Sequence, residues 1–266
     1  MLLRRPAPAR LFILAEPRSG STWLLRTLGS HPEVALAGEL LNHVLAPTMS
    51  RFQGAAPGEF PACLAELERG LPVGRRLTGC KVLLNQLTFI SEDFPAAFVR
   101  HFLPASFILL TRGNPVAAEV SLALAHAHDR WHCWQESEVE LRRVQIEPRG
   151  FCARIAAARS RRERVGGLLA TLGCRHHLIS YEELFADPRR CVGKICAFLG
   201  LDPAPIRFSD ERRGNPFPPS QVVGNYRELV AHLTACEPEL LAALQALEPL
   251  DRDGPAGSRR APASGQ

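Results

Sequence analysis

The sequence lacks any long hydrophobic run. Apolar residues make up 46% of its 266 positions, but no stretch approaches the roughly 18 consecutive apolar residues of a membrane-spanning helix. The first ten residues, MLLRRPAPAR, are charged, and the apolar run that follows is too short for the core of a signal peptide. We therefore expect a cytoplasmic protein without a transmembrane segment.

The sequence also lacks the cysteine and histidine patterns of disulfide frameworks and metal sites. Its eight cysteines form no CxxC pair, and most lie among apolar residues, which predicts buried free thiols in a reducing compartment. The stretch HAHDRWHCW brings His126, His128 and His132 close in sequence, but no further residue completes a convincing ligand set. We predict no metal.

The excess of positive charge is small. The chain has 32 Lys and Arg against 27 Asp and Glu, a net charge of +5, which favours small anionic ligands over a nucleic-acid backbone. The stretch RIAAARSRRER at 154–164 is the densest basic segment. Its charges are expected on the solvated outer face of an amphipathic helix, so we predict no nucleic-acid partner.

Segments typical of strands alternate with segments typical of helices, which predicts an α/β fold with a central parallel sheet flanked by helices on both faces. We find no internal linker, and expect one domain over residues 1–250 and a disordered tail over 251–266. Residues 47–60 are expected to form a loop. The predicted strands are 11–14, 34–37, 77–83, 106–111 and 176–180, and the predicted helices are 21–28, 61–69, 92–101, 115–128, 151–172, 191–200 and 225–247.

The stretch EPRSGSTW stands where the first predicted strand turns into a helix. Such a junction exposes free backbone N–H groups and the positive end of the helix dipole, and Gly20 lets the backbone approach a ligand. Arg18 adds a fork of donors suited to phosphate or sulfate. The alternative is a plain helix cap with a surface arginine. Because GxxxxGK[ST] is absent, the loop is not expected to hold Mg-ATP.

A second candidate for the same ligand follows the strand at 106–111. Arg112 stands directly after this strand, at the edge where open α/β sheets bind ligands. Ser121 lies nine residues further on, within the next predicted helix. The two side chains reach one ligand only if the chain folds back around the strand end, and a serine within a helix often has no functional role.

The segments PRSGSTW and TRGNPVAAEVS, each after a strand, resemble the two signature segments of sulfotransferases that use 3′-phosphoadenosine-5′-phosphosulfate (PAPS). The resemblance implies a P-loop-like parallel α/β fold and metal-independent transfer of a sulfuryl group from PAPS to an acceptor hydroxyl. It also implies that the first segment grips the 5′-phosphosulfate and the second holds the 3′-phosphate. The implied contacts are Arg18, Ser19, Gly20, Ser21 and Thr22 at the 5′ end, and Arg112 and Ser121 at the 3′-phosphate.

Further segments extend the resemblance over about residues 11–230. SHPEVALAGELLNH, GCKVLLNQL, LISYEELFADPRRCVGKICAFLGLD and GNYREL are similar to stretches of the bacterial carbohydrate-type branch, which includes trehalose and lipopolysaccharide sulfotransferases. Arg18 points to the same branch, because cytosolic small-molecule sulfotransferases usually carry lysine there. The resemblance implies a carbohydrate or glycolipid acceptor. Arg212-Arg213-Gly214 is only a loose match to the family's RKG-like loop.

Sulfuryl transfer is a loose in-line displacement, and it needs stabilisation of the leaving group and a base for the acceptor hydroxyl. Arg18 is expected to stabilise the leaving phosphate. Glu39 is our first choice as base, since the resemblance places a base at the matching glutamate; its alternative role is in a cap or an ion pair. His31 is the second choice. Lys81 either faces the sulfonate or is simply solvated.

The acceptor itself is not readable from the sequence. Its pocket is expected between loops 43–62 and 126–150, where Trp131 or Trp134 either stacks on a sugar or packs as a core or lid residue. Two other functions are kept open: a non-catalytic protein that binds a nucleotide or anion, and a small P-loop kinase. A homo-oligomer is left open as well.

Overall fold

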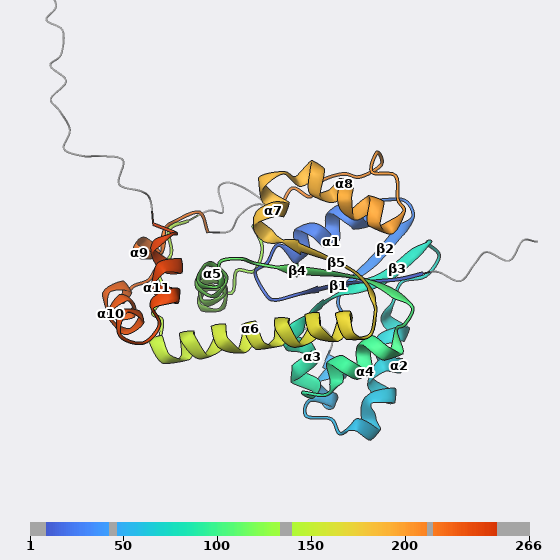
Figure 1. The fold of residues 1–266 in the computed structure, drawn as a ribbon, viewed down its shortest axis with the longest axis horizontal. Coiled ribbons are helices and arrows are strands. Elements are labelled where there is room, and N and C mark those ends of the chain that lie inside the picture. Colours follow the sequence, from blue (N-terminus) through green and yellow to red (C-terminus); the bar gives the residue numbers. More distant parts are fainter. Residues whose placement is uncertain (1–8, 43–46, 134–139, 212–214, 249–266) are drawn as a thin grey trace, which may run out of the picture.

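The computed structural model of the chain describes residues 9–42, 47–133, 140–211 and 215–248 (Figure 1). The predicted tail at 251–266 lies outside these residues, as do Trp134 and the segment 212–214.

A five-stranded parallel sheet forms the centre of the fold, with strand order β2-β3-β1-β4-β5. The predicted α/β fold with a parallel sheet is confirmed, and each predicted strand lies within an observed one. The carboxyl ends of β1 and β4, adjacent in the sheet, bring the two motif segments to the same edge. The strands are β1 (Ala9–Ala15), β2 (Val34–Glu39), β3 (Leu77–Leu83), β4 (Ala105–Thr111) and β5 (Arg175–Ser180).

Helices cover both faces of the sheet, as predicted (Figure 1). One layer, drawn above the sheet, contains α1 (Ser21–Gly29), α7 (Tyr181–Ala186) and α8 (Pro188–Leu199). The other layer contains α2 (Phe60–Gly70), α3 (Leu84–Ile90), α4 (Phe94–His101) and the C-terminal part of α6 (Pro148–Thr171). The period of two along a strand divides the apolar residues between two cores.

Strand β1 shows this division most clearly. Phe12 and Leu14 point into the core between the sheet and α4 and α6. Leu11 and Ile13 point into the core on the other face, between the sheet and α1 and α8. All four are fully buried. Apolar residues on both faces are the mark of a parallel strand covered on each side.

A third apolar cluster lies beyond the edge of the sheet. It joins α5 (Pro115–His128) and the N-terminal part of α6 to α9 (Pro219–Val222), α10 (Tyr226–Cys236) and α11 (Pro238–Gln245). The prediction of one helix over 225–247 is wrong, because α10 ends at Cys236 and Pro238 begins a new helix. Proline has no N–H for an internal helical hydrogen bond and is favoured in a first turn.

Short helices account for most other differences from prediction. The expected loop at 47–60 contains two 3₁₀ helices, Pro47–Phe52 and Pro57–Glu59, while α3 and α7 begin directly after strands. In α7, Ser180 Oγ accepts from the Glu183 N–H at 3.1 Å, and the Glu183 carboxylate accepts from the Ser180 N–H at 3.0 Å. This reciprocal capping starts a helix too short to show apolar periodicity.

All eight cysteines are free thiols and six of them are buried, which confirms that part of the prediction. None of the described helices is long and apolar enough to cross a membrane.

Gly79 sets the contact between the two central strands β3 and β1. A Cβ at this position would lie 1.7 Å from the carbonyl oxygen of Leu11. We therefore expect Gly79→Ala to force the strands apart and to lower the free energy of unfolding by about 1–3 kcal/mol or more, the usual cost of overpacking. Urea denaturation measures this change.

Gly193→Ala in α8 is the matched control, because a Cβ there meets nothing within 4 Å. This substitution is expected to raise stability by about 0.5–1 kcal/mol through helix propensity. Equal effects of the two substitutions would contradict the packing argument.

Candidate active site

The loop between β1 and α1 forms a tight turn that ends in a left-handed glycine. Arg18 has φ 61° and Gly20 has φ 82°, and the buried Ser19 hydroxyl donates to the Glu16 carbonyl at 2.7 Å. A Cβ at Gly20 would lie only 2.8 Å from Cε2 of Phe185. The position thus requires glycine both for its φ angle and for its close contact with α7.

This turn leaves the amino end of α1 open. Gly20, the residue that precedes the helix, has no side chain with which to cap it, and Ser21, Thr22 and Trp23 of the first turn line a cavity of about 1010 Å³. Free N–H groups at a helix start attract anions. The Ser19 hydroxyl, in contrast, is used inside the loop.

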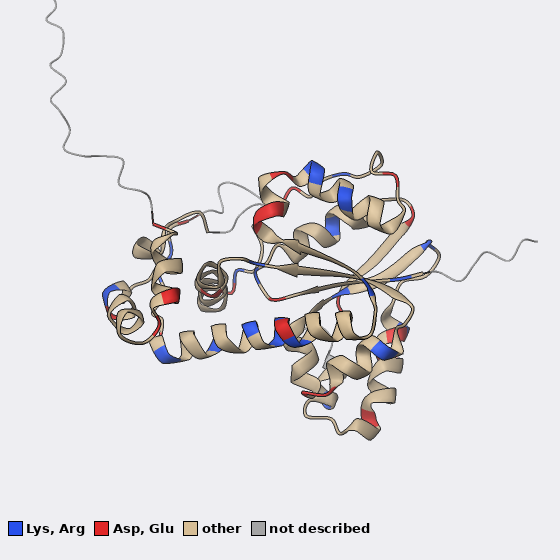
Figure 2. Ribbon diagram, viewed as in Figure 1, with Lys and Arg blue, Asp and Glu red and all other residues tan. Residues whose placement is uncertain are grey.

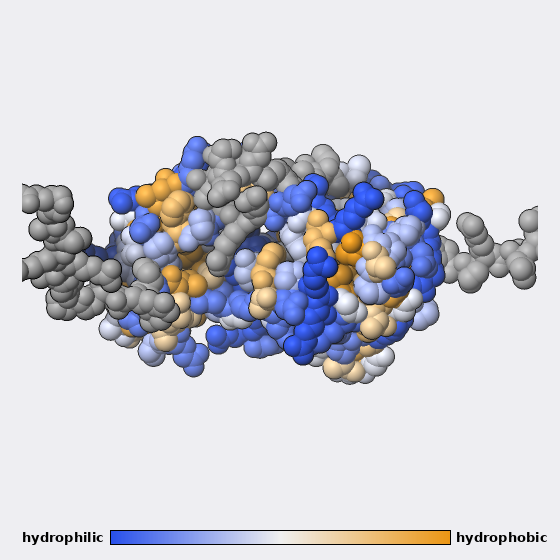
Figure 3. Space-filling view, turned by 90° about the horizontal axis from the view of Figure 1, so that it is seen from above, coloured by the Kyte–Doolittle hydropathy of each residue, from blue (hydrophilic) through white to orange (hydrophobic). Residues whose placement is uncertain are grey.

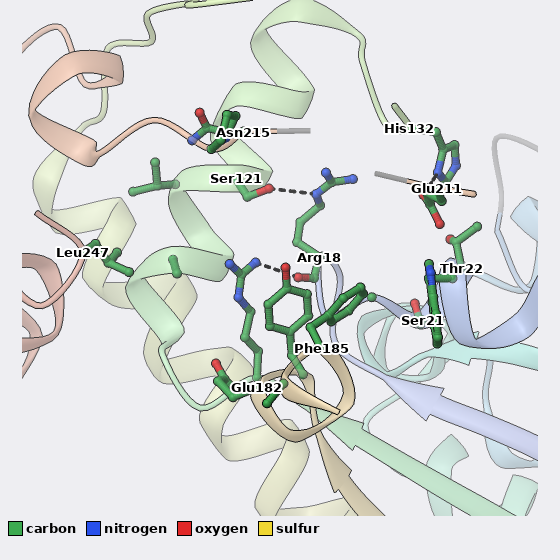
Figure 4. Close-up of a pocket in the computed structure, with 18 of the residues that line it drawn as sticks. Arg18, Ser21, Thr22, Ser121, His132, Glu182, Phe185, Glu211, Asn215 and Leu247 are labelled. Carbon is green, nitrogen blue, oxygen red and sulfur yellow. Dashed lines mark hydrogen bonds and ion pairs between the residues drawn. The ribbon is translucent and has the colours of Figure 1, made fainter. Parts of the chain in front are cut away.

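The cavity lies between the sheet with its helices and the smaller cluster of α9–α11. Its walls come from α1, α5, α7 and the segment 215–219 (Figure 4). Seen from above the α1–α8 layer, a small hollow lies between these two parts of the surface, with both hydrophilic and hydrophobic residues beside it (Figure 3).

Arg112, directly after β4, braces the loop. Its Nη1 donates to the Arg18 carbonyl at 2.9 Å, and its guanidinium lies 4.4 Å from the centre of the Tyr181 ring. The turn that follows is held by Glu182, whose carboxylate accepts from the N–H groups of Gly113 at 2.8 Å and Asn114 at 3.3 Å. Arg112 therefore stands in a fixed position at the cavity wall.

Ser121 reaches the same place from α5. Its hydroxyl accepts a hydrogen bond from Nε of Arg18 at 3.1 Å (Figure 4). Arg18, Arg112 and Ser121 all line the cavity. The chain therefore folds back around the end of β4, as the sequence required for Arg112 and Ser121 to reach one ligand. Burial lowers the pKa of Arg18, while Glu211 and Tyr181 oppose this shift. The guanidinium nevertheless keeps its positive charge at neutral pH.

Aromatic rings form one side of the cavity. The Tyr181 and Phe185 rings lie 4.5 Å apart between centroids, and Phe185 is 5.4 Å from Trp23. All three residues line the cavity. Such a wall suits a flat ring system, because offset and tilted aromatic contacts are favourable.

Glu39 belongs to a buried network beside the loop rather than to the cavity lining. Lys81 Nζ lies 2.7 Å from one carboxylate oxygen, and the other accepts from Asn42 at 3.0 Å and Gln86 at 2.6 Å. Lys81 also donates to the Thr22 hydroxyl at 2.8 Å. The ammonium of Lys81 therefore links Glu39 to the first turn of α1, and it is buried rather than solvated.

The pKa of Glu39 reflects this network. Burial by itself raises it, but the charge and hydrogen bond of Lys81, with those of Asn42 and Gln86, bring the pKa below its ordinary value of 4.5. Glu39 is accordingly a carboxylate at neutral pH.

His31 is not brought to this site. It precedes β2 and so lies at the opposite edge of the sheet, with Nε2 3.0 Å from the Asp202 carbonyl and Nδ1 accepting from the Glu33 N–H at 3.1 Å. Its buried ring fixes a turn.

The three histidines of the segment 126–132, and Trp131, each have a partner of their own. The His126 ring lies edge-on to Trp131 at 4.8 Å, His128 Nε2 is 3.1 Å from the Arg143 carbonyl, and His132 Nδ1 is 2.7 Å from Glu211. The Trp131 carbonyl also accepts from Arg18. Within the described ranges, no group of three or more His, Cys, Asp or Glu side chains could hold a metal ion.

Comparison with known proteins gives sequence relatives of similar length. No family model matches the chain. Nodulation protein H of Rhizobium meliloti (strain 1021) is 28% identical over 239 residues, covering 85% of this chain and 91% of the relative. Nodulation protein H of Rhizobium tropici is 29% identical over 217 residues, covering 79% and 82%.

Among solved structures, a sulfotransferase from Alicyclobacillus acidocaldarius superposes with a TM-score of 0.52 at 18% identity, over 91% of this chain and 96% of that one. The fold is that of a sulfotransferase. The predicted sulfotransferase fold is confirmed.

The structure also has a second cavity, of about 380 Å³, which the sequence did not predict. Arg161 forms two hydrogen bonds of 3.0 Å with the Glu16 carboxylate, and Arg154 pairs with Glu119 of α5. All four residues line the second cavity. The prediction that the arginines of 154–164 lie on a solvated outer face is therefore wrong for Arg161, whose side chain is only 21% exposed.

No sequence motif pointed to this pairing, because Glu16 and Arg161 lie 145 residues apart. The partners come from helices distant in sequence.

Proposed function

We propose that the chain transfers the sulfuryl group of PAPS to a hydroxyl of a carbohydrate or glycolipid acceptor, without a metal ion. The observation that carries this proposal is the meeting of Arg18, Arg112 and Ser121 with the open amino end of α1 in one cavity. Together they offer two places for anionic groups, one at each side of Arg18.

A nucleotide with phosphates at its 5′ and 3′ positions fits this arrangement. The 5′ end would lie at the turn of Gly20 and the N–H groups of Ser21 and Thr22, and the 3′-phosphate would lie at Arg112 and Ser121. The aromatic wall gives a surface for the purine. In the structure Arg18 occupies the space between these two places and contacts Ser121. It would have to turn to contact the 5′ end.

The chemistry needs positioning and charge stabilisation more than covalent help from the protein. Arg18 and the first amides of α1 would stabilise the charge that develops on the leaving phosphate. Lys81, 2.8 Å from the Thr22 hydroxyl, would place a second positive charge beside the transferred group.

Glu39 would take the proton of the acceptor hydroxyl. Its carboxylate is charged at neutral pH and Lys81, Asn42 and Gln86 fix its orientation. These same donors weaken it as a base, because they hold its pKa down. A non-catalytic protein that only binds a nucleotide would not need this carboxylate beside the loop, and a P-loop kinase would need the Lys-Ser/Thr pair that is absent.

Adenosine 3′,5′-bisphosphate (PAP) tests the donor site without any acceptor. At about 100 times its Kd, it is expected to add about 2.7 kcal/mol to the free energy of unfolding without magnesium, seen as a higher melting temperature. Arg112→Met should weaken PAP binding about 10- to 100-fold through loss of a charge-assisted contact.

Arg100→Met is the control for this experiment, since Arg100 is exposed on α4. A larger stabilisation by Mg-ATP than by PAP would contradict the proposal.

Glu39→Gln tests the base. The substitution keeps the shape and is expected to leave PAP affinity unchanged while turnover with PAPS and acceptor falls by about 100-fold or more. Because the pKa of Glu39 lies below 4.5, the carboxylate is present throughout neutral pH. The acid limb of the kcat/KM profile should accordingly lie below pH 4.5.

Glu163→Gln, at an exposed position of α6, is the matched control. An acid limb above pH 4.5 that survives in Glu39→Gln would assign the base to another carboxylate. Glu16 would be the first to test, because burial raises its pKa.

A further inference from the structure

The second cavity lies on the other side of the anion loop. Glu16 and Pro17 line it, whereas Arg18 and Gly20 line the large cavity, and Arg112 lines both. The loop that would hold the 5′-phosphosulfate is therefore a shared wall. In-line displacement needs the acceptor on the side of the sulfuryl group opposite to the leaving phosphate, so an acceptor in the second cavity would have to reach the sulfuryl group past Arg112, which borders both cavities.

The second cavity also adjoins the candidate base. Leu84 and Asn85, the first residues of α3, line it. The next residue, Gln86, donates to the Glu39 carboxylate at 2.6 Å. The lining of the second cavity therefore reaches to one residue from the network of Glu39 and Lys81, although neither of these two residues lines it.

Both polar and apolar surfaces line this space. The apolar part contains Leu84, Leu110, Leu122 and Ile155, and the polar part comes mainly from arginines of α6. Figure 2 shows the basic residues spaced along this helix. Its volume of about 380 Å³ falls within the range of small-molecule sites, roughly 300–1,000 Å³. A pyranose ring offers matching surfaces, with apolar C–H faces and polar edges.

The charges of the lining are not balanced. Two of its arginines are paired with carboxylates, Arg161 with the half-buried Glu16 and Arg154 with the buried Glu119. Arg159 has only a 4.0 Å contact with the exposed Glu239. Arg162 forms no ion pair within 4 Å among the described residues, and its charge acts on Glu16, which Arg161 already pairs. Apart from the shared Arg112, four guanidinium groups face two carboxylates and leave an excess of two positive charges.

From this excess we infer that the second cavity is the acceptor site and that the acceptor is an acidic sugar, held through its carboxylate or phosphate by Arg162 and Arg159. This inference rests on the proposed function, because it concerns the acceptor of the same reaction. A neutral sugar would leave the excess of positive charge unchanged, whereas an anionic group would pair with it.

The test measures binding of three small sugars by saturation-transfer NMR, with and without PAP. The probes are methyl β-D-glucuronide, glucose 6-phosphate and, as the neutral counterpart, methyl β-D-glucoside. At least one acidic probe is expected to bind about tenfold more tightly than the neutral one. The two acidic probes separate carboxylate from phosphate recognition.

Two variants assign the binding to this cavity. Arg162→Gln should abolish the preference for the acidic probe, while Arg149→Gln, at an exposed position of the same helix, should keep it. Ala158→Trp should fill the cavity and block all three sugars without changing PAP affinity. Ala158 lines only this cavity of the two.

The inference would be overturned if the neutral sugar bound as well as the acidic ones, if no probe bound, or if Arg162→Gln left the preference intact. Failure of PAP to bind would contradict the proposed function instead, and the titrations without PAP still test the cavity in that case.

Discussion

The turn between β1 and α1 is the constraint on which the site depends. Gly20 must take a left-handed conformation with no room for a Cβ beside Phe185, and Arg112 holds the Arg18 carbonyl from the neighbouring strand end. Because β1 and β4 are adjacent and parallel, a residue after one strand can brace the loop after the other. The open start of α1 follows from this geometry.

A buried ion pair extends this constraint to the third strand. Lys81 of β3 contacts Glu39 of β2 and Thr22 of α1. One ammonium group therefore joins two neighbouring strands to the first turn of α1. Placing charges in the interior is costly unless they are paired and hydrogen-bonded. Here Asn42 and Gln86 also donate to the Glu39 carboxylate, which offsets part of this cost. The charged pair lies where we propose that an acceptor hydroxyl needs a base.

The sequence predicted the parts of the fold that repeat a simple pattern. Buried parallel strands are short apolar runs, and the long amphipathic helix α6 shows its period, so both were found. The capped helix α7 was missed because it is too short for a period. The break at Pro238 was missed because Leu229, Leu233, Leu240 and Leu244 keep a helical spacing across it. Arg18, Arg112 and Ser121 were found from motifs, but the pairing of Glu16 with Arg161 depends on long-range packing that a single sequence does not show.

The central claim is that the α1 loop and the segment of Arg112 and Ser121 bind one nucleotide. A crystal structure of the complex with adenosine 3′,5′-bisphosphate tests it most directly. The account predicts the 3′-phosphate between Arg112 and Ser121, with Arg18 turned away from the Ser121 hydroxyl toward the 5′-phosphate at the start of α1. A nucleotide bound with its 3′-phosphate elsewhere, and with the contact between Arg18 and Ser121 intact, would contradict it.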